Sequence, residues 1–156
     1  MRVPAVAGQF YEDDADALRR QVESCFTHRL GPGSMPRPGR GPRELRGLVV
    51  PHAGLMYSGP VAAHAYAAVA RDGAPEVLVI FGPNHTGLGA GIAVGTVDWE
   101  TPIGKVTCDV DLAKRIAARP PASEDIIAHR FEHSIEVQLP FLVFLGLQTP
   151  FVPICV

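Results

Sequence analysis

The chain has 156 residues, which is enough for one domain with a hydrophobic core and too few for two domains of ordinary size. Hydrophobic residues make up 47% of the chain and charged residues 19%, a composition that excludes an intrinsically disordered protein. The formal net charge is -2, so neither nucleic acid nor an anionic membrane surface is expected as a partner.

The N-terminus and the cysteines indicate the compartment. Residues 12–16 contain four acidic side chains where a signal peptide would be apolar, and no run of about 18 apolar residues occurs. Cys25, Cys108 and Cys155 are odd in number and far apart, which fits neither a disulfide framework nor a paired-cysteine metal site. These features predict a cytoplasmic protein.

The first predicted helix begins after Asp14, which can cap it, because Leu18, Val22 and Phe26 recur on one helical face. In residues 27–46, prolines and glycines alternate among five arginines, which predicts a mobile surface loop. The arginines could form a patch for a polyanion, but a solvated linker is the better interpretation.

Two short apolar runs come next, at residues 48–50 and 76–81, and both are typical of buried parallel strands. Between them, Ser58 and Pro60 precede an alanine-rich segment that ends near Arg71, which predicts a helix. The order strand, helix, strand predicts a right-handed βαβ unit.

The rest of the chain predicts a strand at 91–97, a turn at 101–104 and helices at about 109–118 and from His133. The chain ends on an apolar strand at 151–156, which would leave a sheet edge uncovered. We therefore expect a single α/β domain over residues 1–156 that looks truncated, with a mostly parallel central sheet flanked by helices.

Two histidines directly follow the predicted parallel strands, His52 in VPHAG and His85 in GPNHTG. The carboxyl ends of neighbouring parallel strands meet at one edge, so both imidazoles would point into one crevice. Neutral imidazoles suit iron, copper or zinc, and a third ligand would be needed. A hydrogen-bonded loop or core position explains each histidine about equally well.

Residues 128–140 form a third candidate, because five ionisable side chains precede an apolar helix. On a helix, Glu136 would share a face with both Glu132 and His133. A carboxylate bonded to a histidine fixes its tautomer and raises its basicity, as a metal site or a general base requires. A charged helix start is an equally good interpretation, and Cys155 fits a buried apolar residue better than a ligand.

Six motifs together resemble the Memo-like family, in the right order and over essentially the whole chain. They are VAGQFY at 6–11, VPHAG at 50–54, YSG at 57–59, GPNH at 82–85, TPIG at 101–104 and EHSIEVQLPF at 132–141. The resemblance reaches only about the first half of the family's usual length. Family members resemble the catalytic subunit of class III extradiol dioxygenases, and a bacterial and archaeal relative is grouped with a radical-SAM enzyme in the AmmeMemoRadiSam system.

The resemblance implies that His52 and His85 are metal ligands and that His133 is a further histidine of the pocket. If the chain is catalytic, we expect His133 with Glu132 to act as the base or to support the metal ligands. The third ligand of the family, a cysteine, and an Asp/His pair of the same pocket would lie outside the matched half. Further pocket residues would be Asn84, Tyr57 and Glu136.

The sequence is compatible with three functions, one catalytic and two non-catalytic. The first is an oxidoreductase-like metalloprotein with iron or copper, and zinc is less favoured. The second is a module that binds a small molecule, a peptide or a radical-SAM partner protein, and the third is a fragment without activity. We expect this chain alone to bind metal weakly or not at all, because two neutral imidazoles leave the charge of the ion uncompensated. His133 or Cys155 would change this only if the fold brought one of them to the same point.

Overall fold

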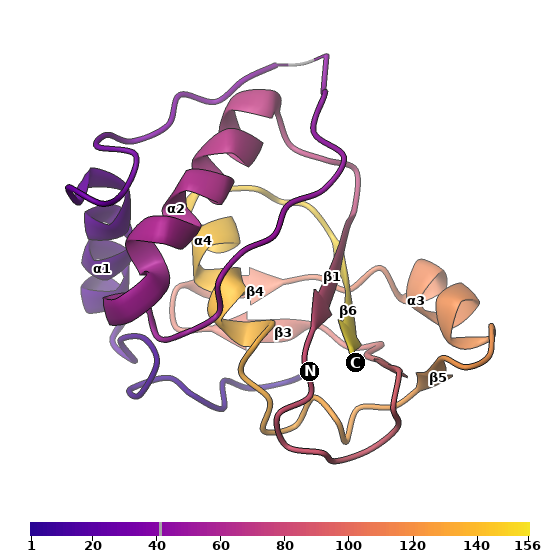
Figure 1. Ribbon diagram of the computed structural model, residues 1–156. Coiled ribbons are helices and arrows are strands. Elements are labelled where there is room, and N and C mark those ends of the chain that lie inside the picture. The colour runs from indigo at the N-terminus through magenta and orange to yellow at the C-terminus, as the bar shows by residue number, and fades with distance from the viewer. Residues whose placement is uncertain (41) are drawn as a thin grey trace.

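The structure is a computed structural model that describes residues 1–40 and 42–156 (Figure 1). Its elements are α1 (Ala15–Thr27), α2 (Leu55–Asp72), β1 (Leu78–Gly82), β2 (Ala93–Val94), β3 (Trp99–Thr101), β4 (Gly104–Val106), α3 (Val110–Ala117), β5 (Ser123–Glu124), the 3-10 turn η1 (Glu136–Gln138), α4 (Leu139–Phe144) and β6 (Phe151–Cys155). The predicted α/β class is confirmed. No described helix is long and apolar enough to cross a membrane.

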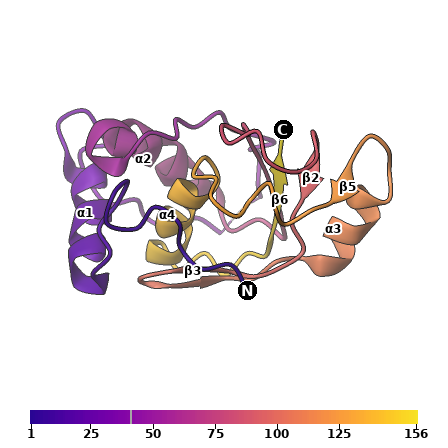
Figure 2. The same cartoon turned by 90° about the horizontal axis from the view of Figure 1, so that it is seen from below.

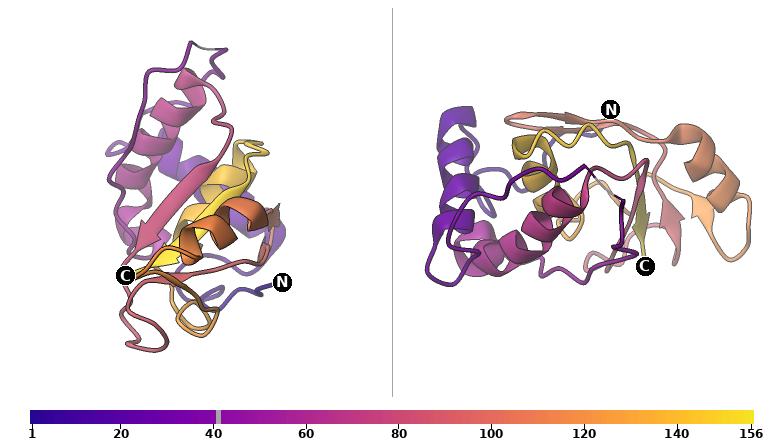
Figure 3. Two further views of the ribbon diagram at one scale, coloured as in Figure 1. Left: turned by 90° about the vertical axis from the view of Figure 1, so that its right-hand side faces the viewer. Right: turned by 90° about the horizontal axis from the view of Figure 1, so that it is seen from above.

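The main sheet has four strands in the order β1-β6-β2-β5. β1 runs parallel to β6, from Leu78 opposite Phe151 to Gly82 opposite Cys155, and Figure 3 shows the two strands side by side. β2 is parallel to β5 and antiparallel to β6, so the sheet is mostly parallel. The C-terminal strand β6 therefore lies inside the sheet, and all five of its residues are buried.

Helices cover the sheet from two sides (Figure 2). α1 packs on α2 and α4 on one side, and α3 packs on β2, β5 and β6 on the other. The core between the helices is aromatic, since Tyr66 stacks on Phe141 at 4.7 Å and Phe26 meets Phe141 edge-on at 5.8 Å. β3 and β4 form a separate hairpin over the TPIG motif.

Two helices begin where the sequence predicts them, because a side chain caps each one. Asp14 accepts a hydrogen bond from the Ala17 amide at the start of α1, and Asp109 accepts one from the Leu112 amide at the start of α3. Such caps satisfy amides that have no partner inside the helix.

The strand predicted at residues 48–50 is not formed, and neither is the βαβ unit that depended on it. This segment is extended but pairs with no strand among the described residues, and the side chain of Val49 is fully exposed. An apolar run becomes a strand only when a neighbour satisfies its backbone groups. The helix predicted from His133 also begins later, as the 3-10 turn at Glu136.

The second half of the Pro/Gly/Arg-rich segment is bound to the C-terminal end of α2. The Glu44 and Leu45 amides donate to the Asp72 carboxylate at 2.8 and 3.2 Å, and the Gly39 amide donates to the Ala70 carbonyl. Arg43 lies 3.6 Å from Asp72. These contacts bring the chain along α2 toward residues 48–52.

Candidate functional site

Three imidazoles meet beyond the carboxyl end of β1. His52 lies just before α2, His85 lies in the loop after β1, and His133 lies shortly before η1. Each offers a ring nitrogen, and these nitrogens all lie within 4.8 Å of one another. The ring centroids of His85 and His133 are 4.5 Å apart, and His52 lies 5.2 and 5.9 Å from them.

Close packing at the end of β1 brings His85 to His133. A Cβ atom on Gly82 would lie 2.5 Å from Ser134 Oγ and 2.6 Å from Ile135 Cγ1, so only glycine fits there. The Ser134 hydroxyl donates to the Pro83 carbonyl at 3.0 Å. The loop after β1 is therefore fixed against the segment that carries His133.

The carboxylate of Glu132 contacts two of the three histidines, His85 and His133. One oxygen accepts from the His85 amide at 2.6 Å, and the other accepts from His85 Nδ1 at 2.9 Å and from the His133 and Ser134 amides at 2.8 and 3.0 Å. His133 Nδ1 lies 3.2 Å from the second oxygen. The carboxylate thus faces the Nδ1 side of both rings.

These contacts also influence the protonation states of Glu132 and His133. Burial alone would raise the pKa of Glu132, but the hydrogen bonds from His85, Ser134 and His133 outweigh it and lower the pKa to about 2. Burial lowers the pKa of His133 despite the nearby Glu132, and the other two histidines lower it further. The Glu132 carboxylate is therefore a buried anion next to the His133 imidazole, which is neutral at neutral pH.

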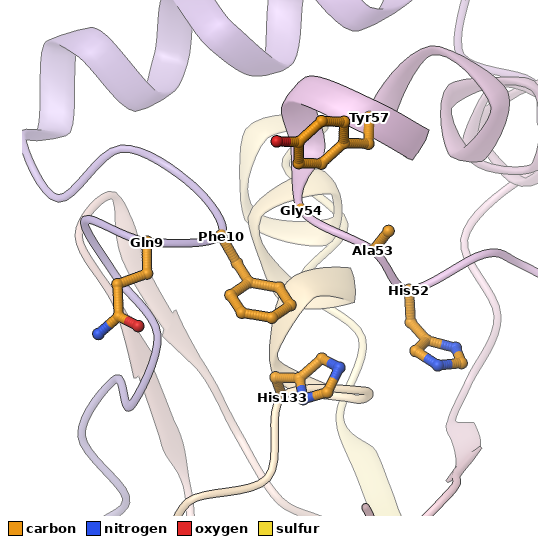
Figure 4. A pocket seen from close by; sticks show the side chains of 7 residues that line it. All are labelled: Gln9, Phe10, His52, Ala53, Gly54, Tyr57 and His133. Atoms are coloured by element: carbon orange, nitrogen blue, oxygen red, sulfur yellow. The ribbon is translucent and has the colours of Figure 1, made fainter.

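A cavity of about 390 Å³ opens beside the cluster. Figure 4 shows the Phe10 ring next to His133, with Tyr57 at the start of α2 and His52 beyond Ala53. The Phe10 and His133 ring centroids are 4.5 Å apart. The Phe10 carbonyl accepts from the Leu55 amide at 2.7 Å, so the N-terminal segment is joined to the start of α2.

The predicted pocket residues have different surroundings. Tyr57 lines this cavity, and its side chain is 79% exposed. The Asn84 side chain holds the loop after His85, since its amide donates to the Leu88 carbonyl and its oxygen accepts from the Gly87 amide. Glu136 is fully buried in a separate network.

That network joins the N-terminal segment to the core. Glu136 accepts from Arg2 Nη1 and the Tyr11 hydroxyl, both at 2.6 Å, and from the Ala5 and Val6 amides. The expectation that Glu132 and Glu136 share a helical face is wrong, because residues 132–135 form no helix and the two carboxylates have different partners.

Sequence reasoning missed Phe10 as a cavity residue. The VAGQFY motif contains it, but nothing local in the sequence indicates that this segment lies beside His133. The three cysteines are buried, and burial raises each thiol pKa to about 11. Among the described residues, the metal-ligating side chains that gather here are the three histidines, and Cys155 is not one of them.

Comparison with known proteins identifies the family. The family model described as Memo-like protein matches residues 2–156. A MEMO1 family protein of Methanopyrus kandleri is 51% identical over 157 residues, and one of Methanothermobacter thermautotrophicus is 49% identical over 156 residues. Each match covers 99% of this chain.

A third relative, the MEMO1 family protein of Sulfurisphaera tokodaii, is 46% identical over 161 residues and matches all of this chain. The chain spans little more than half the length of these relatives, 56% for the first two and 57% for the third. With the family model covering nearly every residue, the chain belongs to the Memo-like family.

Proposed function

We propose that this chain is a metal-binding scaffold in which His52, His85 and His133 bind one first-row transition-metal ion. The observation that carries the proposal is the convergence of three ring nitrogens within 4.8 Å of one another. Nitrogens on one tetrahedral ion lie about 3.4 Å apart, given metal–nitrogen distances of about 2.0–2.1 Å. Small rotations of the imidazoles would close the remaining distance.

The donor set fits such an ion. His85 donates from Nδ1 to Glu132, which leaves Nε2 unprotonated and free to bind. The lowered pKa of His133 keeps its ring neutral, as a ligand must be. Glu132 supplies negative charge directly behind the rings, which compensates part of the charge of the ion. Weak binding was expected for a site with two imidazoles. With the imidazole of His133 as a third ligand, we propose tighter binding.

We assign iron or copper to the site ahead of zinc, because the dioxygenases that Memo-like proteins resemble carry out redox chemistry and imidazole suits all three ions. Such an ion would supply a coordination position for oxygen or a substrate. His85 leaves that position accessible, since 45% of its side chain is exposed. Phe10 and Tyr57 form apolar walls beside it. We propose that a whole Memo-like protein would use this ion for oxidoreductase activity.

A second candidate function rests on the cavity itself. Its volume of about 390 Å³ and its Phe10 and Tyr57 walls suit a small apolar group of a small molecule or of a peptide from a partner protein, such as a radical-SAM enzyme. Binding of this kind would not depend on a metal. Adding a chelator therefore separates the two functions, because it abolishes only the first.

The test is calorimetric titration of the purified chain with Cu(II), Zn(II) and, without oxygen, Fe(II). We expect one site of micromolar or tighter affinity, weakened at least about tenfold by His52→Ala, His85→Ala or His133→Ala. His64→Ala is the matched control, because His64 is exposed on α2 outside the cluster. Equal affinities for all four variants would refute the site.

A further inference from the structure

The main sheet has an open edge along β1. β6 pairs with one side of β1, and no strand in the described part of the chain pairs with the other. Val79 and Phe81 of β1 are 41% and 66% exposed. An apolar strand with unpaired backbone groups is a template for another strand, so natural proteins cover such edges.

A groove of about 690 Å³ runs beside this edge. One wall is β1 along its whole length, the other is the extended segment 43–50, and the buried side chains of Tyr66 and Leu142 also line it. Figure 1 shows the segment passing from the end of α2 toward its start, separate from β1. A groove between two extended segments is suited to a third extended segment, which can pair with the open strand.

Residues 48–50, in the groove wall opposite β1, are apolar but partly exposed. Residues 48–50 read Leu-Val-Val, which is typical of a strand buried on both faces. Leu48 lines the groove and is 42% exposed, and Val49, outside the groove lining, is 100% exposed. Phe81 of β1 is likewise apolar and exposed. Both walls of the groove therefore have sequences suited to a buried sheet, and neither pairs with a strand on the groove side within residues 1–40 and 42–156.

The relatives contain a polypeptide that could be that neighbour. The match covers 56% of the Methanopyrus kandleri protein, so 44% of its chain lies outside the match. We propose that the groove between β1 and residues 48–50 binds an extended strand from this remaining part of a Memo-like chain. The strand pairs with the backbone of β1 and covers Val79, Phe81 and Leu48, which line the groove.

A second copy of this chain fits the groove less well. Pairing β1 with a strand inside another sheet requires that sheet to approach in plane, and residues 43–50 stand across the groove in its way. A single strand has no such obstacle. The inference does not depend on the metal site, so either can fail without the other.

The test is co-expression of this chain with a tagged polypeptide that comprises the remaining part of the Methanopyrus kandleri protein. We expect a one-to-one complex that a Val79→Asp/Phe81→Asp double variant abolishes. Ile127→Asp is the matched control, because Ile127 is 58% exposed and lies outside the groove. Circular dichroism of each variant alone checks that the fold is retained.

Hydrogen exchange supplies a second measurement. The β1 amides that face the groove should exchange at least ten times more slowly in the complex than in the chain alone. If the added polypeptide is insoluble by itself, the same comparison is made with both parts fused in one chain. The proposal is overturned by unchanged β1 exchange, or by a complex that tolerates the double variant. Protection of both groove walls in the chain alone, or a dimer of this chain lost in the double variant, would also overturn it.

Discussion

Glu132 and Glu136 are four residues apart and equally buried, yet they belong to two different regions of the molecule. In the part of the chain that the structure describes, all the side-chain and amide donors to Glu136 come from residues 1–11, so its network is closed and joins the N-terminal segment to the core. The donors to Glu132 come from His85, His133 and the adjacent Ser134, and the two rings border open space. A buried carboxylate is structural where its partners are enclosed, and it can serve a site where its partners keep a free face.

The largest expected effect is on folding, at Glu136. Glu136→Ala should lower the free energy of unfolding by about 3–5 kcal/mol, because it leaves the Arg2 guanidinium buried without a counter-charge. Urea denaturation followed by circular dichroism measures this loss, and exposed Glu12→Ala is the control. A loss below about 1 kcal/mol would show that the network is not the structural region described here.

Glu132→Gln sharpens the comparison from the other side. It should weaken metal binding by about 10–100-fold, because the amide group cannot hold His85 through both its ring and its backbone N–H. Glu136→Gln, the matched variant, should leave the metal affinity unchanged in the fraction that remains folded. Calorimetric titration of both variants decides the point. Equal losses of affinity would mean that the two carboxylates do not have separate roles.

The stability of the protein should depend on pH through His129. Burial lowers the pKa of His129 from 6.5 to about 4, so the unfolded chain binds more protons than the folded chain between these values. The contribution of His129 is complete above pH 6.5 and is lost as the pH falls toward 4. From pH 7 to pH 5 the free energy of unfolding should fall by about 2 kcal/mol through this group. Chemical denaturation at both pH values checks this, and His129→Gln should flatten the dependence. A stability that rises toward pH 5 would contradict it.

The smallest effect is expected in the Pro/Gly/Arg-rich segment. Arg37 and Arg40 are exposed, so replacing both with serine should change stability by less than about 0.5 kcal/mol. Thermal unfolding of the double variant measures the change. A fall of several degrees in Tm would show that these arginines stabilise the fold.

Local patterns predict part of this structure. The cap at Asp14, the start of a helix near residue 109 and the apolar run of β6 could be predicted directly, and so could the positions of His52 and His85 after apolar runs. That residues 48–50 form no strand could not be predicted, because a strand depends on a neighbour that its own residues do not specify. The meeting of Phe10 with the histidines depends on contacts between segments far apart in the chain.

X-ray absorption at the metal edge of the copper-loaded chain tests the central claim most directly, because it counts the ligands of the ion. We expect three imidazole nitrogens at about 2.0–2.1 Å, and two in the His133→Ala variant. One or two imidazoles in the unmodified chain, or a sulfur neighbour near 2.3 Å, would contradict a site made of His52, His85 and His133.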